Sequence, residues 1–301
     1  MGFEYNVLEG FWTRWSDEEL HDVVADARRY NVGLFLWVHS KKLRDPAART
    51  EMFDRCKAAG AAGLKIDFFD HEHKEVIDLY QAILRETAEH HLLVNFHGAN
   101  KPTGESRTWP NELTREAVRG MEASKLADRA THDATLPFTR YLAGPADYTP
   151  MLFSDRRGNT TWTHQIATAV VFTSPLITFA AHPQKIVDHP ACNLIKLIPA
   201  SWDETLVLPL SEIGESAILA RRTGDDWFVA AVNGAAGKKV ELPLSFLKPG
   251  VDYSAMTARD VSSDPATLEF SDRVTLTAAQ KLAFDCAPGG GFVARLAPVQ
   301  R

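Results

Sequence analysis

The chain has 301 residues, of which 45% are hydrophobic and 24% are charged, a composition typical of a globular protein with ample core material. Its net charge of −6 and the scattered placement of its basic residues argue against nucleic acid as the main partner. Its first residues do not read as a signal peptide, no apolar run is long enough to span a membrane, and three distant cysteines predict core thiols rather than disulfides or a metal cluster.

Strand-like runs alternate with helix-like stretches in the first part of the chain. Ser16 and Glu19 form a capping box before an apolar helical stripe, and Asp45 followed by Pro46 marks the start of the next helix. The strand-like runs recur roughly every thirty residues, the size of one β/α unit of a barrel. The runs are residues 3–9, 32–39, 63–69 and 92–98, with weaker candidates at 120–124, 138–143 and 175–180.

This alternation predicts a parallel sheet with right-handed crossovers, and the repeat length favours a (β/α)8 TIM-type barrel. Seven candidate strands are present, whereas a closed barrel has eight. Because the first strand candidate begins almost at Met1, we expect that the first barrel strand and an upstream piece are missing from this sequence.

The pattern changes after about Thr205. Two strand-like runs flank the turn signal Gly224-Asp225-Asp226, and further short strands follow without strong helical stripes. We therefore predict a catalytic α/β barrel domain over residues 1–205, incomplete at its N-terminus. We predict a small antiparallel β-sandwich domain over residues 206–301.

Polar side chains occupy the carboxyl ends of successive predicted strands. In residues 63–69 the apolar side chains alternate with Lys65 and Asp67, and in the next strand candidate Asn95 and His97 alternate with apolar side chains in the same way. The preceding strand candidate ends on His39. Because alternate side chains point inward, and barrel enzymes build their sites at this end, Asp67 is a candidate catalytic group.

Each of these residues also has a purely structural reading. Lys65 and Asp67 can form a buried ion pair, and His97 alone is typical of a hydrogen-bonded core histidine. The segment "HEH" at 71–73 lacks the spacing of a metal-binding HExxH motif and reads as a solvated helix terminus.

Two later loops are rich in hydrogen-bonding groups. Residues 97–125 combine glycine and proline with Glu116 and Glu122, and residues 137–150 mix aromatic rings with Arg140. The first composition suits a substrate-facing loop, and a solvated loop with surface carboxylates is its alternative. The second suits contact with sugar rings and equally suits ordinary loop packing.

Several long stretches in order resemble glycoside hydrolase family 97. They are "GLKIDFFD", "HGANKPTGESRTWPN", "TREAVRGMEASK", "PFTRYLAGPADYTP" and "WDET". The resemblance implies an exo-acting α-glycosidase with a (β/α)8 barrel, a large N-terminal β-sandwich, a small C-terminal β domain and a calcium ion near the sugar. It also implies a periplasmic or secreted location.

The resemblance assigns roles to particular residues. It places the nucleophile of retaining, α-galactosidase-like members on Asp67, and it places Gly98 where inverting, α-glucosidase-like members carry a glutamate base. It further implies that Glu122 is the acid/base and that Glu116 is a calcium ligand. Lys65, His97, Lys101 and Arg140 are expected to contact the substrate.

The sequence therefore predicts a retaining exo-α-glycosidase for terminal α-galactosides, with a small-molecule or oligosaccharide substrate and Ca²⁺ as cofactor. A separate N-terminal β domain is a candidate partner, because the family takes another calcium ligand from the region upstream. The alternatives are an α-glucosidase of the same family and a truncated, non-catalytic fragment that binds sugar or is inactive.

Overall fold

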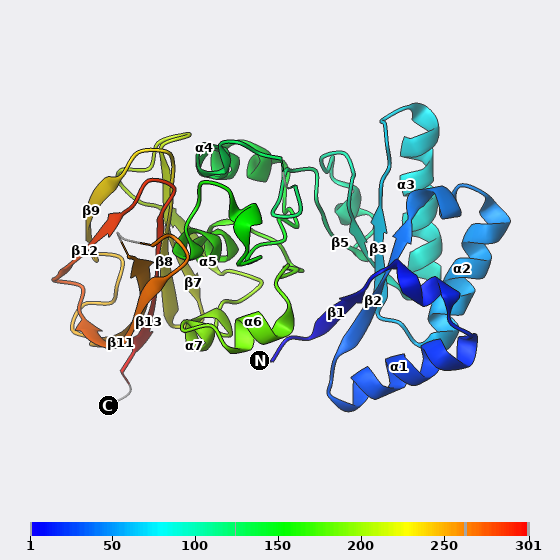
Figure 1. Ribbon diagram of the computed structural model, residues 1–301, viewed down its shortest axis with the longest axis horizontal. Helices are drawn as coiled ribbons and strands as arrows, with labels where there is room; N and C mark the ends of the chain where they lie inside the picture. Colours follow the sequence, from blue (N-terminus) through cyan, green and yellow to red (C-terminus); the bar gives the residue numbers. More distant parts are fainter. Residues whose placement is uncertain (1, 124, 262–263, 300–301) are drawn as a thin grey trace. The chain divides into compact units, whose positions relative to one another are not determined.

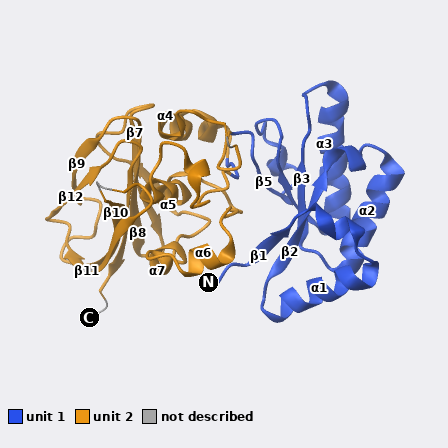
Figure 2. Cartoon of the chain, in the orientation of Figure 1, with its two compact units in different colours: residues 1–118, 145–147 blue, residues 119–144, 148–301 orange. Residues whose placement is uncertain are grey.

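The computed structural model describes residues 2–123, 125–261 and 264–299 of the chain (Figure 1). It divides into two compact units, shown in different colours in Figure 2. The first unit comprises Met1–Val118 with Pro145–Asp147, and the second comprises Arg119–Gly144 with Tyr148–Arg301. The boundary that we predicted between residues 205 and 206 stays a prediction.

The first unit is an α/β structure built on a parallel sheet. Its strands pair in the order β1-β2-β3-β4-β5. They are β1 (Tyr5–Leu8), β2 (Gly33–His39), β3 (Gly63–Asp67), β4 (Leu93–Phe96) and β5 (Glu112–Arg115). The helices are α1 (Asp17–Arg29), α2 (Pro46–Ala59) and α3 (Lys74–Glu89), with 3-10 turns at Gly10–Arg14, Ser40–Leu43 and Glu105–Arg107. The four main predicted strands are confirmed.

Local sequence signals determine where these helices begin and end. Glu19 N donates to Ser16 Oγ at 3.1 Å and Ser16 N donates to Glu19 Oε2 at 2.7 Å, which confirms the predicted capping box. Asp45 caps α2 with Pro46 in the first turn, and Gly60 ends it with a φ of +81°.

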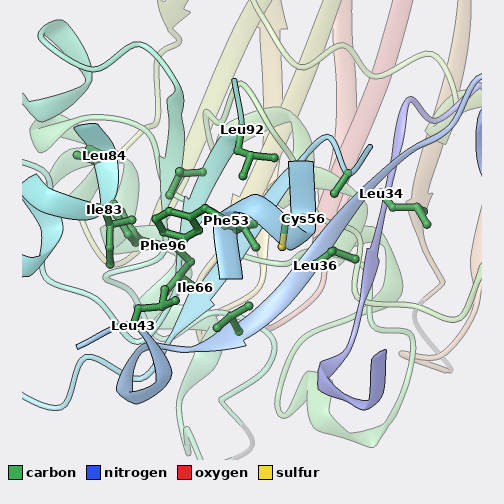
Figure 3. Close-up of a cluster of buried hydrophobic side chains, with 14 of the residues drawn as sticks. Leu34, Leu36, Leu43, Phe53, Cys56, Ile66, Ile83, Leu84, Leu92 and Phe96 are labelled. Carbon is green, nitrogen blue, oxygen red and sulfur yellow. The ribbon is translucent and has the colours of Figure 1, made fainter. Parts of the chain in front are cut away.

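The core of the first unit lies between the sheet and its helices (Figure 3). Leu64 and Ile66 of β3 and Phe96 of β4 are completely buried in this cluster, so they face the helices as the alternation predicted. Phe68 departs from the pattern: it follows β3 with a φ of +64° and is 50% exposed, because the strand ends at Asp67.

The three weaker strand predictions are wrong, and one strand was missed. Residues 120–123 form a turn, with residue 124 outside the described part of the chain, and residues 138–143 lie in 3-10 turns. Residues 175–180 belong to no described strand; Pro175 has no N–H to donate to a ladder. The missed strand, β5, is only four residues long and ends on Arg115, so it lacks an apolar alternation.

The second unit carries the antiparallel sheets. One sheet has the order β11-β10-β13-β8-β7-β6, and β12 pairs with β9 in another. The strands are β6 (Glu204–Val207), β7 (Ser216–Thr223), β8 (Asp226–Asn233), β9 (Lys238–Pro243), β10 (Tyr253–Asp260), β11 (Leu268–Leu276), β12 (Lys281–Cys286) and β13 (Gly291–Pro298). The predicted C-terminal antiparallel β domain is therefore confirmed, including the hairpin turn at Gly224.

Short helices accompany these sheets. They are α4 (Arg129–Thr135), α5 (Trp162–Val171), α6 (Pro183–Val187) and α7 (Cys192–Ile195), with 3-10 turns at Leu136–Phe138, Arg140–Ala143 and Asp155–Arg157. Nine of the ten residues of α5 are buried. Among the described residues, no helix has both the length and the apolar character needed to cross a bilayer.

Candidate functional site

Asp67 is the last residue of β3, and two donors hold its carboxylate. Trp37 Nε1 donates to Asp67 Oδ2 at 3.1 Å, and the backbone N–H of Phe68 donates to Asp67 Oδ1 at 2.7 Å. Trp37 reaches Asp67 because β2 and β3 pair in parallel, with Trp37 opposite Lys65 and His39 opposite Asp67. The Asp67 side chain is thus fixed in direction and remains at the boundary of the buried region.

The backbone of β3 approaches that of β4 closely just beyond Asp67. Phe69 N donates to Gly98 O at 3.0 Å, and Gly98 has a φ of +49°. A Cβ atom at position 98 would lie 2.8 Å from Phe68 N and 2.9 Å from Asp67 Oδ1. Position 98 therefore requires glycine for both its φ and its space while Asp67 is present.

A cluster of buried polar side chains, which we call the first polar cluster, comprises Asn95, His97 and Asp147. Asn95 Nδ2 donates to Asp147 Oδ2 at 2.7 Å, and His97 Nε2 lies 2.9 Å from the same oxygen. All three side chains are at most 1% exposed. The geometry assigns the Nε2 proton to His97, because an ionised Asp147 only accepts.

Electrostatics favours that ionised state. Burial alone raises the pKa of Asp147, but the hydrogen bond and charge of His97, the charge of Lys65 and the hydrogen bond from Asn95 outweigh it. The pKa of the Asp147 carboxyl is therefore below its usual value. Lys65, 3% exposed on β3, thus contributes its charge to this cluster.

Glu116 follows β5 and faces the same strand ends. Its Oε2 accepts from Gly98 N at 2.8 Å and lies 3.8 Å from His97 Nδ1. A carboxylate is the ligand type that calcium prefers, so Glu116 fits that role in kind. It supplies at most two of the six to eight oxygens that calcium takes. Calcium binding at Glu116 therefore stays a prediction.

Two shallow hollows adjoin these strand ends. One, of about 340 Å³, is lined by Phe68, Tyr80 and Gly98 among others, and the other, of about 390 Å³, is lined by Lys101 and Thr103 among others. Asn100 lines both, and Arg115 Nη1 donates to its Oδ1 at 2.7 Å. Lys101, which is exposed, lines the second of these hollows.

The structure thus brings Lys65, Asp67, His97 and Glu116 together at the carboxyl ends of β3, β4 and β5 of the first unit. Glu122 and Arg140 belong to the second unit: Glu122 is exposed in a turn, and Arg140 Nη1 donates to Gly144 O at 2.9 Å. Their assigned roles, like those of the other site residues, stay predictions.

Two residues of the site, Trp37 and Asp147, have no role in the predictions from the sequence. Trp37 has the same strand parity as His39, so the alternation alone could have placed it on the Asp67 side of the sheet. Asp147 lies in a loop segment that returns to β5 through a bond from Asp147 N to Arg115 O at 3.4 Å. This return depends on the tertiary fold, and no local pattern indicates it.

The segment "HEH" forms an exposed group at the start of α3. The ligand atoms of His71, His73 and Glu75 lie within 4.8 Å of one another, and His73 N donates to His71 Nδ1 at 3.4 Å. The three side chains are all at least partly exposed, and the interpretation of this segment as a solvated helix terminus stays a prediction.

The fold and the site define an α/β protein with carboxylates gathered at the carboxyl ends of parallel strands. The family model described as "Glycoside hydrolase 97" matches residues 2–118, and the model "Glycosyl-hydrolase 97 C-terminal, oligomerisation" matches residues 201–297. The chain belongs to glycoside hydrolase family 97, which confirms the resemblance read from its motifs.

Two curated relatives carry names that describe an activity. The chain is 35% identical over 244 residues to a "Probable retaining alpha-galactosidase" of Streptomyces bingchenggensis, an alignment that covers 80% of this chain and 38% of that protein. It is 29% identical over 325 residues to a "Retaining alpha-galactosidase" of Bacteroides thetaiotaomicron, covering 98% and 48%. The chain thus spans less than half of the length of each.

A solved structure shows the same fold. The crystal structure of a beta-arabinopyranosidase superposes with a TM-score of 0.84 at 27% identity, covering 98% of this chain and 50% of that one. This likeness supports an α/β part followed by a C-terminal β domain.

Proposed function

We propose that this chain carries the nucleophile of a retaining exo-α-glycosidase that acts on terminal α-galactosides. The observation that carries the proposal is the carboxylate of Asp67, held by Trp37 and the Phe68 N–H at the end of β3, beside a glycine that leaves no room for another side chain. The names of the two curated relatives support the choice of galactose and of a retaining mechanism.

In the proposed reaction, an Asp67 oxygen attacks the anomeric carbon and the bond from that carbon to the leaving oxygen breaks. Glu122 gives its proton to the leaving oxygen, and a glycosyl-enzyme remains on Asp67. Glu122 then takes a proton from a water molecule, whose oxygen attacks the anomeric carbon and releases Asp67. This mechanism requires the two carboxyl groups to lie about 5–5.5 Å apart.

The remaining groups have supporting roles. The Trp37 indole keeps one Asp67 oxygen hydrogen-bonded, so the attack comes from a carboxylate of fixed direction. His97, oriented by Asp147, together with Lys65, Lys101 and Arg140, would bind sugar hydroxyls. A calcium ion, when bound with Glu116 among its ligands, would supply positive charge and coordination for sugar hydroxyls.

We also propose the context in which the chain works. Its parallel strands would belong to a (β/α)8 barrel, with residues 1–205 in the barrel domain and residues 206–301 in the C-terminal domain. An N-terminal β domain would be a partner of that barrel, and the protein would act in the periplasm or outside the cell. The fraction of each relative that the chain covers leaves room for such additional parts.

The decisive experiment measures hydrolysis of aryl α-galactosides by the chain, with calcium and with a chelator. Asp67→Ala should lower kcat/KM by at least about 1,000-fold, and azide should restore turnover by forming a β-galactosyl azide. Asp78→Ala, which changes an exposed carboxylate on α3, is the matched control and should keep full activity. Full activity of Asp67→Ala would refute the nucleophile assignment. An inactive unmodified chain would favour the non-catalytic fragment.

The same assay should include an aryl β-L-arabinopyranoside, because a similar solved structure is named a beta-arabinopyranosidase. A β-L-arabinopyranoside has the ring configuration of an α-D-galactopyranoside without the hydroxymethyl group, so one pocket can admit both. A higher kcat/KM on the aryl β-L-arabinopyranoside would reassign the substrate and leave the roles of Asp67 and Glu122 intact. A preference for aryl α-glucosides would favour the α-glucosidase alternative.

A further inference from the structure

The buried guanidinium group of Arg129 donates hydrogen bonds to the turn that carries Glu122. We call residues 119–123 the acid loop. Arg129 Nη1 donates to Gly120 O at 2.9 Å and Arg129 Nη2 donates to Ala123 O at 2.6 Å. These carbonyl groups lie on either side of Glu122. Arg129 is 1% exposed, whereas Glu122 is exposed, so the loop is anchored on its inner side and presents Glu122 on its outer side.

The backbone of the acid loop also packs closely against Tyr148. Met121 N donates to Tyr148 O at 3.0 Å, and a Cβ atom at Gly120 would lie 2.3 Å from that same oxygen. Within the loop, Ala123 N donates to Gly120 O at 3.1 Å. The residues adjoining Glu122 therefore have little freedom to shift as long as Arg129 and Tyr148 stay in place.

Arg129 is itself held by a chain of buried polar groups. Its Nη1 donates to Tyr148 Oη at 3.2 Å, and Tyr148 Oη donates to the Asp133 carboxylate at 2.6 and 2.7 Å. His164 Nε2 lies 3.1 Å from Asp133 Oδ2, and His164 Nδ1 lies 3.0 Å from Gly290 O. We call Arg129, Asp133, Tyr148 and His164 the second polar cluster; each is at most 1% exposed.

This chain of contacts runs from the acid loop to the C-terminal β domain. Arg129 and Asp133 lie on α4, His164 lies on α5, and Gly290 directly precedes β13. An apolar cluster of equal volume would be about as stable as such buried charges, so stability alone gives weak reason for them. Their hydrogen bonds instead fix where particular backbone groups lie.

We propose that the second polar cluster positions Glu122 for proton transfer, and that it makes the C-terminal β domain part of the support of the acid loop. Arg129 is thus a positioning residue. The inference rests on the proposed function, in which Glu122 is the acid/base. A positioned general acid contributes about 100- to 10,000-fold to a rate, and displacements of about 0.5 Å already matter at such sites.

The test uses the dependence of the rate on the leaving group. A methyl α-galactoside needs a proton on its leaving oxygen, whereas a dinitrophenyl α-galactoside leaves without one. The kcat/KM value reports only the first step on both substrates, so a later need for Glu122 as a base does not enter. Concentrations of active enzyme are set by titration with a covalent galactose-configured inhibitor, so that unfolded molecules do not count.

Tyr148→Phe removes the hydroxyl that joins Arg129 to Asp133 and keeps the ring. We expect it to lower kcat/KM on the methyl galactoside about 10- to 30-fold, and on the dinitrophenyl galactoside at most about threefold. Arg129→Lys, which cannot donate to two carbonyl groups in the same planar way, should show a larger loss with the same selectivity. His164→Gln should show a smaller one.

Asp260→Asn is the matched control. Asp260 accepts from Thr161 Oγ1 at 2.7 Å and from Gly291 N at 2.9 Å, so it joins α5 to the start of β13 without contacting the acid loop. We expect it to lower the unfolding temperature and leave the ratio of the two kcat/KM values unchanged.

The outcomes separate this inference from the proposed function. If Glu122→Ala shows no selective loss on the methyl galactoside, the acid/base assignment fails. If Glu122→Ala is selective but Tyr148→Phe and Arg129→Lys lower both substrates equally, as a structural defect would, only the positioning role is overturned. If none of the three cluster variants yields folded protein while Asp260→Asn folds, the cluster is a requirement of folding and the inference is rejected.

Discussion

The two polar clusters are each centred on a buried aspartate, and they use it differently. In the first polar cluster Asp147 forms hydrogen bonds with two side chains. They are Asn95, which lies on β4 next to the strand that carries Asp67, and His97, which directly follows β4. In the second polar cluster Asp133 is bonded to Tyr148 and His164, and the cluster ends on backbone carbonyls.

The difference indicates two uses of a buried charge. The first polar cluster sets the proton position of a side chain at the site, because the ionised Asp147 determines which nitrogen of His97 carries the proton. The second holds main-chain segments at fixed positions. A change in the first should therefore alter chemistry and stability together, and a change in the second should alter mainly stability and positioning.

The largest effect is expected from Asp147→Asn. It removes the buried negative charge with which Lys65 and His97 interact, and breaking such a buried pair costs about 3–5 kcal/mol. We expect the free energy of unfolding to fall by that amount, and kcat/KM to fall about 100-fold on both test substrates. Urea unfolding and steady-state kinetics measure the two effects. Unchanged kinetics at full folding would mean that the first polar cluster is merely structural.

Asp133→Asn provides the contrast in the second polar cluster. The amide keeps an acceptor for Tyr148 but loses the charge, so we expect a loss of about 2–3 kcal/mol in the free energy of unfolding. Per active molecule, kcat/KM on the dinitrophenyl galactoside should stay within about threefold. A 100-fold loss there would erase the distinction between the clusters.

Gly291→Ala sharpens the comparison by altering the packing beside His164 without removing a polar group. The new Cβ would lie 2.7 Å from the His164 Cα and 2.9 Å from Ala231 O. Such overpacking costs about 1–3 kcal/mol, which thermal unfolding would detect. Gly237→Ala is the control, because the nearest atoms to its Cβ lie at 3.5 Å and the stability should hardly change.

The smallest effect concerns pH and lies outside both clusters. Burial lowers the pKa of His189 to about 4, and its ring stacks on Phe153 with centroids 4.4 Å apart. In the unfolded chain the pKa of His189 is 6.5, so below this pH the unfolded chain binds a proton at His189 that the folded chain does not bind. The free energy of unfolding therefore falls as the pH drops from 6.5 towards 4. We expect a loss of about 1 kcal/mol by pH 5, allowing for partial solvent screening.

His189→Phe should remove that loss between pH 7 and pH 5. His182→Phe is a close control: His182 Nδ1 accepts from Gln184 N at 3.2 Å, as His189 Nδ1 accepts from Ala191 N at 3.1 Å, but His182 is exposed. Its replacement should leave the pH dependence unchanged. Equal effects of the two variants would refute burial as the cause.

Local patterns predicted the parts of the fold that local physics determines. The capping box at Ser16, the proline start at Pro46 and the alternation around Asp67 were all readable, because each depends on residues within one or two turns or one strand. The strand β5 could not be predicted in this way. Its four-residue sequence is polar and shows no strand pattern, and it is a strand because it pairs with β4.

The site residues also fall into those that a local pattern predicted and those that depend on the tertiary fold. Parity placed Lys65, Asp67 and His97 on one side of the sheet, whereas the role of Asp147 depends on a loop that returns to β5 after about thirty residues. The anchoring of Glu122 by Arg129 is local in sequence but depends on Tyr148, which only the tertiary fold supplies.

The crowding at Gly98 also limits the order in which positions 67 and 98 can change during evolution. If descendants of a protein like this one were to exchange Asp67 for a base at position 98, a side chain introduced there first would meet Asp67 Oδ1 at 2.9 Å and Phe68 N at 2.8 Å. The aspartate would have to be shortened before the new group arrived. The intermediate between the two forms would then carry neither carboxylate, and under the role proposed for Asp67 it would have no turnover.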